Sequence, residues 1–271
     1  MKGFGTDEKA LIEVLCKRTF DQRREIALAY KTSYGKDLIQ DIKSETRGNL
    51  ELVLKSLLRT PIELEAHDLK NAIDGAGTDE EVLIDVMCTK TNSEMLELKD
   101  TYRRMYNRDL ERDVSGDVSG YFKRLIVSLA AAHRSDLPPD FSKAQQQASE
   151  LYSAGVKSLG TDEVTFNRIF ASESFPHLKV VFEEYQKRAG HDIEQAIRGE
   201  MSGYVEKAFL AIVNTARYPP AYYAQRLHEA MSGTGTCIVN LHKMKFNITF
   251  YLNQYILFFQ IKIQYYFLFR Y

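Results

Sequence analysis

A glycine loop followed at a constant interval by an acidic residue occurs three times in this chain, and no other feature constrains the fold as strongly. The pairs are Gly5 with Glu45, Gly77 with Asp117, and Gly160 with Glu200. Each acid stands three residues before a further glycine. A single match of this kind is weak evidence, whereas three in register indicate an internal repeat, in which each unit packs on the next.

The repeat also defines the domain boundaries that we predict. The interval from Cys16 to Cys88 equals that from Glu45 to Asp117, so the first two units align without a gap. The step to the third unit is longer, and the surplus falls in a Pro-containing segment typical of a linker. We expect repeats at 1–59, 60–134 and 143–217, a linker at 135–142, the start of a fourth repeat at 218–236, and an unrelated aromatic-rich tail at 237–271.

Between the loops, apolar residues recur with helical spacing. One stripe consists of Leu50, Val53, Leu54, Leu57 and Leu58, and the second unit repeats it as Phe122, Leu125, Ile126 and Leu129. Another consists of Leu11, Val14 and Leu15, then Leu83, Val86 and Met87, then Phe166, Ile169 and Phe170. Because no segment alternates as a strand would, we predict an all-α fold with about five short helices per complete repeat. The glycine loop is expected between the first and second helices, and the acid between the fourth and fifth.

Composition narrows the function. The formal net charge is −1, which does not suggest a nucleic-acid binder. The chain has three cysteines, and two of them occupy equivalent apolar positions, so we expect buried thiols in a reducing, cytoplasmic compartment; no signal peptide is predicted. The six histidines show no metal or triad spacing, and no Ser or Cys lies in a nucleophile motif, so an enzyme is not expected.

The repeated loop has the composition of a calcium site. Glycines allow positive φ angles and can turn several carbonyl oxygens toward one point. Ca²⁺ takes ~6–8 oxygen ligands, of which three carbonyls and one bidentate carboxylate would supply about five. We therefore expect weak sites whose shells are completed by a lipid phosphate or by the carboxylate of phosphatidylserine, so that metal and membrane raise each other's affinity.

A purely structural interpretation of the loop is open at this point. Gly-Thr-Asp-Glu is also typical of a helix start, with Thr78 and Glu81 forming a capping box. Capping, however, requires no distant acid at a fixed interval, and the threefold coincidence favours the metal site. A phosphate-binding Walker loop and an EF-hand are excluded because their motifs are absent from the sequence.

The fourfold repeat, the Gly-x-Gly-Thr loops, the acid followed by x-Ser-Gly and the long linker between units two and three together resemble the annexin family over roughly residues 1–236. The resemblance implies five-helix repeats in a curved disc with calcium loops on its convex face. It also implies reversible, calcium-dependent binding to acidic phospholipid membranes by a cytoplasmic, peripheral protein.

The resemblance implies the following ligands. The first site would use Met1, Gly3, Gly5 and Glu45; the second Ile73, Gly75, Gly77 and Asp117; the third Gly155, Ser158, Gly160 and Glu200. Weaker accessory sites would involve Thr6 with Glu8, Thr78 with Glu80, and Thr161 with Glu163. The loop tips Phe4, Ala76 and Leu159 would contact the membrane.

The chain also departs from the family pattern. Met1 coincides with the first loop, so we expect the head and first helix of repeat one to be missing, and Arg47 replaces the serine found at 119 and 202. The tail at 237–271 holds eleven of the 31 Phe and Tyr residues. Either it is a membrane anchor or it is translated non-coding sequence; its many polar residues favour the second interpretation. The alternative function is a helical-repeat protein-interaction scaffold or a poorly functional truncated form.

Overall fold

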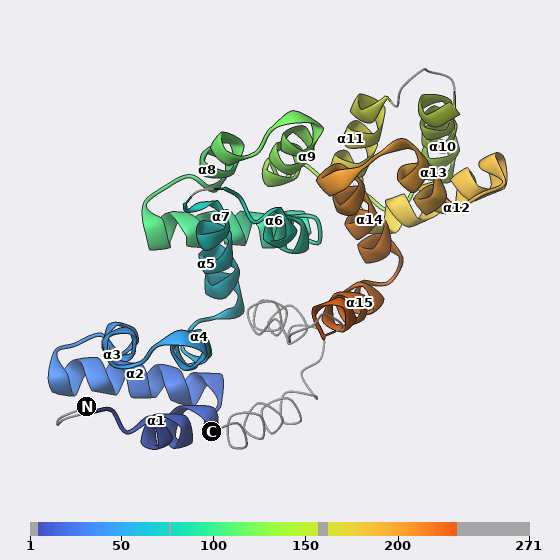
Figure 1. The fold of residues 1–271 in the computed structure, drawn as a ribbon. Helices are drawn as coiled ribbons and strands as arrows, with labels where there is room; N and C mark the ends of the chain where they lie inside the picture. The colour runs from blue at the N-terminus through green and yellow to red at the C-terminus, as the bar shows by residue number, and fades with distance from the viewer. Residues whose placement is uncertain (1–4, 76, 157–161, 232–271) are drawn as a thin grey trace. The chain divides into compact units, whose positions relative to one another are not determined.

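The structure, a computed structural model, describes residues 5–75, 77–156 and 162–231, and every regular element in these ranges is an α-helix (Figure 1). The first predicted repeat contains α1 (Glu8–Cys16), α2 (Phe20–Tyr34), α3 (Leu38–Glu45) and α4 (Gly48–Leu57). The second contains α5 (Pro61–Ile73), α6 (Glu80–Met87), α7 (Asn92–Tyr106), α8 (Leu110–Asp117) and α9 (Gly120–Ala130). The third contains α10 (Phe141–Val156), α11 (Glu163–Ser172), α12 (Phe175–Ala189), α13 (Ile193–Glu200) and α14 (Gly203–Arg217), and α15 (Pro219–Met231) follows. Helix α10 begins within the predicted linker at 135–142, before the predicted start of the repeat.

These helices confirm the all-α prediction. The second and third repeats each have five helices, with the glycine loop after the first and the acid at the end of the fourth. The predicted tail at 237–271 and its two interpretations lie outside the described residues. None of the described helices is long and apolar enough to span a bilayer.

Helix ends repeat as closely as the loops do. Asp37, Asp109 and Asp192 occupy the same place in each repeat, and each is the N-cap of a short helix that ends in the repeated acid. Their carboxylates accept a hydrogen bond from a backbone N–H of the first turn at 3.0, 3.0 and 2.8 Å. Capping thus satisfies donors that have no partner within the helix. These aspartates fix where the helix starts and, with it, where the acid falls at the other end.

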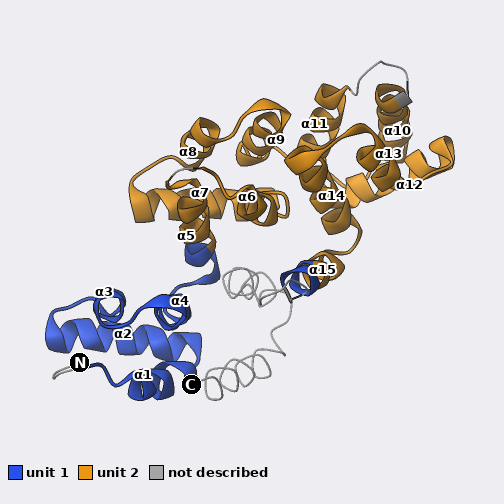
Figure 2. Cartoon of the chain, viewed as in Figure 1, with its two compact units in different colours: residues 1–64, 226–271 blue, residues 65–225 orange. Residues whose placement is uncertain are grey.

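The chain divides into two compact units (Figure 2). Unit 1 comprises Met1–Leu64 and Arg226–Tyr271, and unit 2 comprises Glu65–Gln225. In unit 1 a small core lies among α1, α3 and α4; its buried residues are Leu15, Leu38, Ile42, Leu54, Leu57 and Leu58. The predicted stripes on α1 and α4 supply most of that core.

Unit 2 joins the second and third repeats through a shared core. Helix α14 packs against α6 and α9, and α11 packs against α9. Phe166, Phe170 and Phe209 meet there, with ring centroids 4.9–6.0 Å apart. Exposure of one stripe position differs between the first two repeats: Val14 is 46% exposed, whereas its counterpart Val86 in the second repeat is 5% exposed. Helix α6, which carries Val86, packs on α9 and on α14 of the next repeat.

One buried arginine ties the end of the second repeat to the third. Arg134 is 8% exposed, and its Nη1 donates to the carbonyls of Phe170 and Glu173 at 2.6 and 2.7 Å. Its guanidinium carbon lies 4.5 Å from the ring centroid of Phe175. Burial lowers the pKa of Arg134 to about 10. The side chain therefore closes the carbonyl end of α11 and holds it against the segment that follows α9.

Candidate functional site

The three repeated acids are the last residues of helices. Glu45 ends α3, Asp117 ends α8 and Glu200 ends α13, and all three are exposed. The C-terminal end of a helix carries partial negative charge, so a carboxylate there costs about 0.3–1 kcal/mol unless a cation is near. A cation held near these carboxylates would offset that cost.

In the first two repeats a loop threonine reaches the acid. The hydroxyl of Thr6 donates to a carboxylate oxygen of Glu45 at 2.7 Å and lies 3.1 Å from its backbone carbonyl oxygen. Thr78 makes the same two contacts with Asp117, at 2.7 and 3.0 Å. Each pair is 39 positions apart in sequence. The loop and the distant acid therefore meet with the same geometry in both repeats.

In these loops the N-cap of the following helix is the residue after the threonine. Asp79 is the N-cap of α6, and its carboxylate accepts a hydrogen bond from the backbone N–H of Val82 at 3.4 Å. The Thr78–Glu81 capping box of the purely structural interpretation does not form, because Asp79 occupies the cap position and the Thr78 hydroxyl bonds Asp117. The equivalent caps are Asp7 for α1 and Asp162 for α11.

The loop backbone has the conformation that the glycines predict. Gly75 and Gly77 have φ angles of 123° and 102°, and Gly5 has 99°, all in the region that favours glycine. The N–H of Asp79 donates to the carbonyl of Ala72 at 2.8 Å, which brings the end of the loop back to α5. Ile73 is the last residue of α5, so its carbonyl is not needed for hydrogen bonding within the helix.

The turn after each acid is also repeated. Gly48, Gly120 and Gly203 have φ angles of 61°, 62° and 65° and open the helix that follows the acid. Arg47 stands at the N-cap position of α4, where the other repeats have serine, and none of the three residues makes a side-chain capping bond. The departure at Arg47 thus removes no hydrogen bond, and its backbone is extended like that of the serines.

The third loop is described only at its ends. Gly155 is the residue before the last of α10, and Glu163 is the first residue of α11, after Asp162. Bonds from the hydroxyl and the backbone N–H of Thr165 lower the pKa of Asp162. The remaining predicted ligands and tips lie outside the described residues; they are Met1, Gly3, Phe4, Ala76, Ser158, Leu159, Gly160 and Thr161.

The accessory acids share one position. Glu8, Glu80 and Glu163 each begin the helix that follows a loop. Thr6 and Thr78, which the sequence pairs with Glu8 and Glu80, have their hydroxyls on Glu45 and Asp117. Sequence reasoning missed this second partner, although the constant separation between threonine and acid was a usable signal.

The donor set of the first two loops fits a hard cation. A carboxylate, a threonine hydroxyl and backbone carbonyls are all oxygen donors, which Ca²⁺ prefers to nitrogen or sulfur. Within the described ranges no three His, Cys, Asp or Glu side chains gather as a metal cluster. A cation at these loops would therefore depend on backbone oxygens and one carboxylate per repeat.

Comparison with known proteins agrees with the repeat geometry. The annexin family model matches residues 1–57, 65–129 and 146–212. Annexin A11 of Homo sapiens is 46% identical over 237 residues, which are 87% of this chain and 47% of that protein. The chain thus spans about half the length of such curated relatives.

Solved structures share the fold. Annexin III aligns with a TM-score of 0.84 and 39% identity, over 90% of this chain and 76% of that one. Calcium-bound annexin (Sm)1 aligns with a TM-score of 0.74 and 29% identity, over 91% of this chain and 74% of that one. The family-model matches fall on the three segments that carry the repeated loops and acids, and this chain belongs to the annexin family.

Proposed function

We propose that this protein binds calcium at its repeated loops and, through the bound metal, binds acidic phospholipid membranes such as those containing phosphatidylserine. It acts as a non-enzymatic, peripheral protein on the cytoplasmic side of the membrane. In the second repeat the ligands are the carbonyls of Ile73, Gly75 and Gly77 and the carboxylate of Asp117. Equivalent ligands are Gly5 with Glu45 in the first repeat, and Gly155 with Glu200 in the third.

The observation that carries the proposal is the meeting of loop and acid. Thr6 contacts Glu45, and Thr78 contacts Asp117, at the same 2.7 Å. The loop segment and the carboxylate are thus joined before any metal arrives, which would lower the entropic cost of assembling a site. A calcium-bound state is recorded for the related annexin (Sm)1, which supports the choice of metal.

Each site has few charged ligands. One carboxylate per repeat leaves a divalent cation with net positive charge and with open coordination positions. Bound calcium would supply that charge and those positions to a lipid phosphate or carboxylate. The exposed Glu45 and Asp117 stand where such a headgroup can reach them, because they end their helices at the surface. Several weak sites on one chain would then act together through avidity.

The test is sedimentation with phosphatidylserine vesicles in calcium and in chelator. The triple variant Glu45→Gln, Asp117→Asn, Glu200→Gln is expected to need at least about tenfold more calcium for half-maximal sedimentation, because ligand charge sets calcium affinity. Its helix content should match that of the parent protein, because these side chains are exposed.

A matched control carries the same charge change elsewhere. Glu25→Gln, Asp100→Asn and Glu183→Gln alter exposed acids of α2, α7 and α12, the third helix of each five-helix pattern. This control should sediment like the parent. Unchanged calcium dependence in the triple variant, or an equal loss in the control, would reject the proposed ligands.

A further inference from the structure

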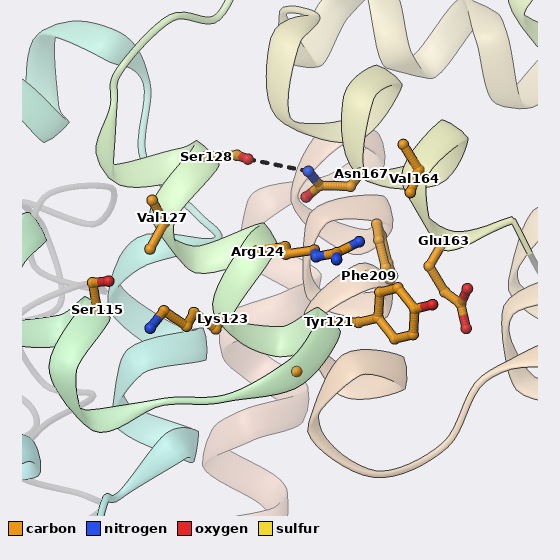
Figure 3. Close-up of a pocket in the computed structure, with 11 residues that line it drawn as sticks. Ser115, Tyr121, Lys123, Arg124, Val127, Ser128, Glu163, Val164, Asn167 and Phe209 are labelled. Carbon is orange, nitrogen blue, oxygen red and sulfur yellow. Dashed lines mark hydrogen bonds between the residues drawn. The ribbon is translucent and has the colours of Figure 1, made fainter.

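A pocket of about 730 Å³ lies in unit 2 between the second and third repeats (Figure 3). Helix α9 forms one wall, and residues of α11 and α14 form the other. Ser115 and Gly120, on either side of Asp117 in sequence, line it, as does Glu163 at the start of α11. The pocket therefore lies beside the segment that carries Asp117, and it shares Glu163 with the predicted accessory site but none of the main metal ligands.

Two cations on α9 line this pocket without a carboxylate partner in the described part of the chain. Lys123 and Arg124 make no ion pair with any described acid, and the guanidinium carbon of Arg124 lies 5.2 Å from the ring centroid of Tyr121. The corresponding charges of the other repeats are all paired within the fold: Glu51 with Lys55, Glu206 with Arg198, and Lys207 with Glu81. A lysine at position 123 is thus not required by the repeat, because both counterparts are glutamates.

The lining of the pocket contains both hydrogen-bonding and apolar side chains. The Nδ2 of Asn167 donates to the Oγ of Ser128 at 3.1 Å, whereas its Oδ1 is buried with no partner among the described residues. Exchanging the amide oxygen and nitrogen would leave the nitrogen unpaired instead. Phe209 and Val127 provide the apolar part of the lining. The Oδ1 of Asn167 has almost no accessible surface, so the polar groups that the pocket offers to a ligand hydroxyl are those of Ser128 and Glu163.

The charge in the pocket is asymmetric. Figure 3 shows Lys123 and Glu163 at opposite sides, with Arg124 between them. Phosphate groups suit the side with the two cations. The carboxylate oxygens of Glu163 accept hydrogen bonds from hydroxyl groups, which suit the opposite side. The volume exceeds what a single phosphate ion fills and lies within the range of about 300–1,000 Å³ for sites that enclose small molecules.

We propose that this pocket binds a phosphorylated polyol, such as an inositol phosphate, with its phosphates on Lys123 and Arg124 and its hydroxyls on Ser128 and Glu163. The ligand can be free or can be the headgroup of a lipid. For the lipid-borne ligand the inference rests on the proposed membrane binding; for the free ligand it does not. Binding here needs no calcium, because every group named is a side chain of the protein.

The experiment measures binding of inositol 1,4,5-trisphosphate to the full chain by titration calorimetry in chelator. Inositol and inorganic phosphate serve as comparison ligands. The variant Lys123→Gln, Arg124→Gln should bind the trisphosphate at least about tenfold more weakly, because two charge-assisted contacts are lost. The control Arg112→Gln, Lys179→Gln removes two exposed cations of unit 2 outside the pocket and should bind like the parent. A second variant, Asn167→Asp, adds a negative charge to the wall and should also weaken binding.

A parallel sedimentation in chelator uses vesicles with and without phosphatidylinositol 4,5-bisphosphate, which distinguishes the lipid source from the free one. The pocket is supported if the Lys123, Arg124 variant loses trisphosphate binding or sedimentation with the phosphoinositide vesicles and the control variant does not. Equal binding by that variant, equal affinity for inorganic phosphate, or no binding of trisphosphate and vesicles by the parent would overturn the proposal. Calcium-dependent sedimentation on phosphatidylserine should persist in this variant, so failure of the pocket and failure of the metal sites are distinguishable.

Discussion

Replacing Arg134 with methionine is expected to destabilise unit 2 substantially. Its Nη1 bonds the carbonyls of Phe170 and Glu173, and these bonds are buried. Methionine keeps the unbranched stem only as far as the position of Nε, so it loses the guanidinium contact with Phe175 and leaves both carbonyls without their donor. The change therefore removes the hydrogen bonds and the cation–π contact together.

The size of the effect follows from two opposing contributions. Two hydrogen bonds from a charged donor stabilise by about 1.5–3 kcal/mol each. Burial of the charge offsets part of this stabilisation. It also lowers the pKa of Arg134 to about 10, and Nη2 has no partner among the described residues. We expect a net loss of about 2–3 kcal/mol, which for a unit of this size lowers the melting temperature by about 5–10 °C.

Thermal and urea unfolding followed by circular dichroism measure the loss. The control is Arg188→Met, since Arg188 is exposed and contacts only the ring of Tyr152, at 6.0 Å, among the contacts described for it. That control should change the unfolding free energy by less than about 0.5 kcal/mol. If Arg134→Met unfolds at the same urea concentration as the control, the clamp between the second and third repeats is not a source of stability.

Two further predictions concern stability. Burial lowers the pKa of His177; Lys143 also lowers it, whereas Glu173 and Asp140 raise it. A histidine whose pKa is depressed in the folded state stabilises the fold above its unfolded pKa of about 6.5. That contribution is lost as the pH falls. Urea midpoints should therefore drop between pH 7.5 and pH 5.5 more steeply for the parent than for His177→Gln, and parallel curves would contradict this. Gly120→Ala should destabilise by about 1 kcal/mol, because φ is 62° there and no atom stands within 4 Å of an added Cβ. The control Gly116→Ala, with equal space and an ordinary helical φ, should be neutral or stabilising by about 0.5 kcal/mol, and equal losses at both glycines would argue against backbone strain.

Much of the architecture could be predicted because the repeat fixes it locally. The spacing from Asp37 to Glu45 sets the start and end of one helix, and the same spacing recurs at Asp109 and Asp192. Contacts between repeats could not be predicted this way. The stripe residue Val14 has the same pattern as Val86, yet only Val86 is buried, and its helix α6 packs on α14, a helix of the next repeat that is distant in sequence.

The candidate site was predictable in part. The approach of loop and acid follows from the constant spacing, but the role of the threonine does not. A Gly-Thr-Asp-Glu sequence allows either Thr78 or Asp79 to cap the helix, and the structure gives that position to Asp79. The pocket beside Lys123 was missed because its two walls are formed by helices of different repeats, and nothing in the sequence of either helix points to the other.

The metal sites are tested most directly by a crystal structure of the protein grown in calcium. We predict an ion within ~2.3–2.6 Å of the Asp117 carboxylate and of the carbonyls of Ile73, Gly75 and Gly77, with an anomalous signal that identifies calcium. A second ion is expected at Glu45. A structure in saturating calcium that shows no ion at either loop would contradict calcium binding by the repeats. In that case Thr78 and Thr6 would still donate hydrogen bonds to Asp117 and Glu45 with no metal between them.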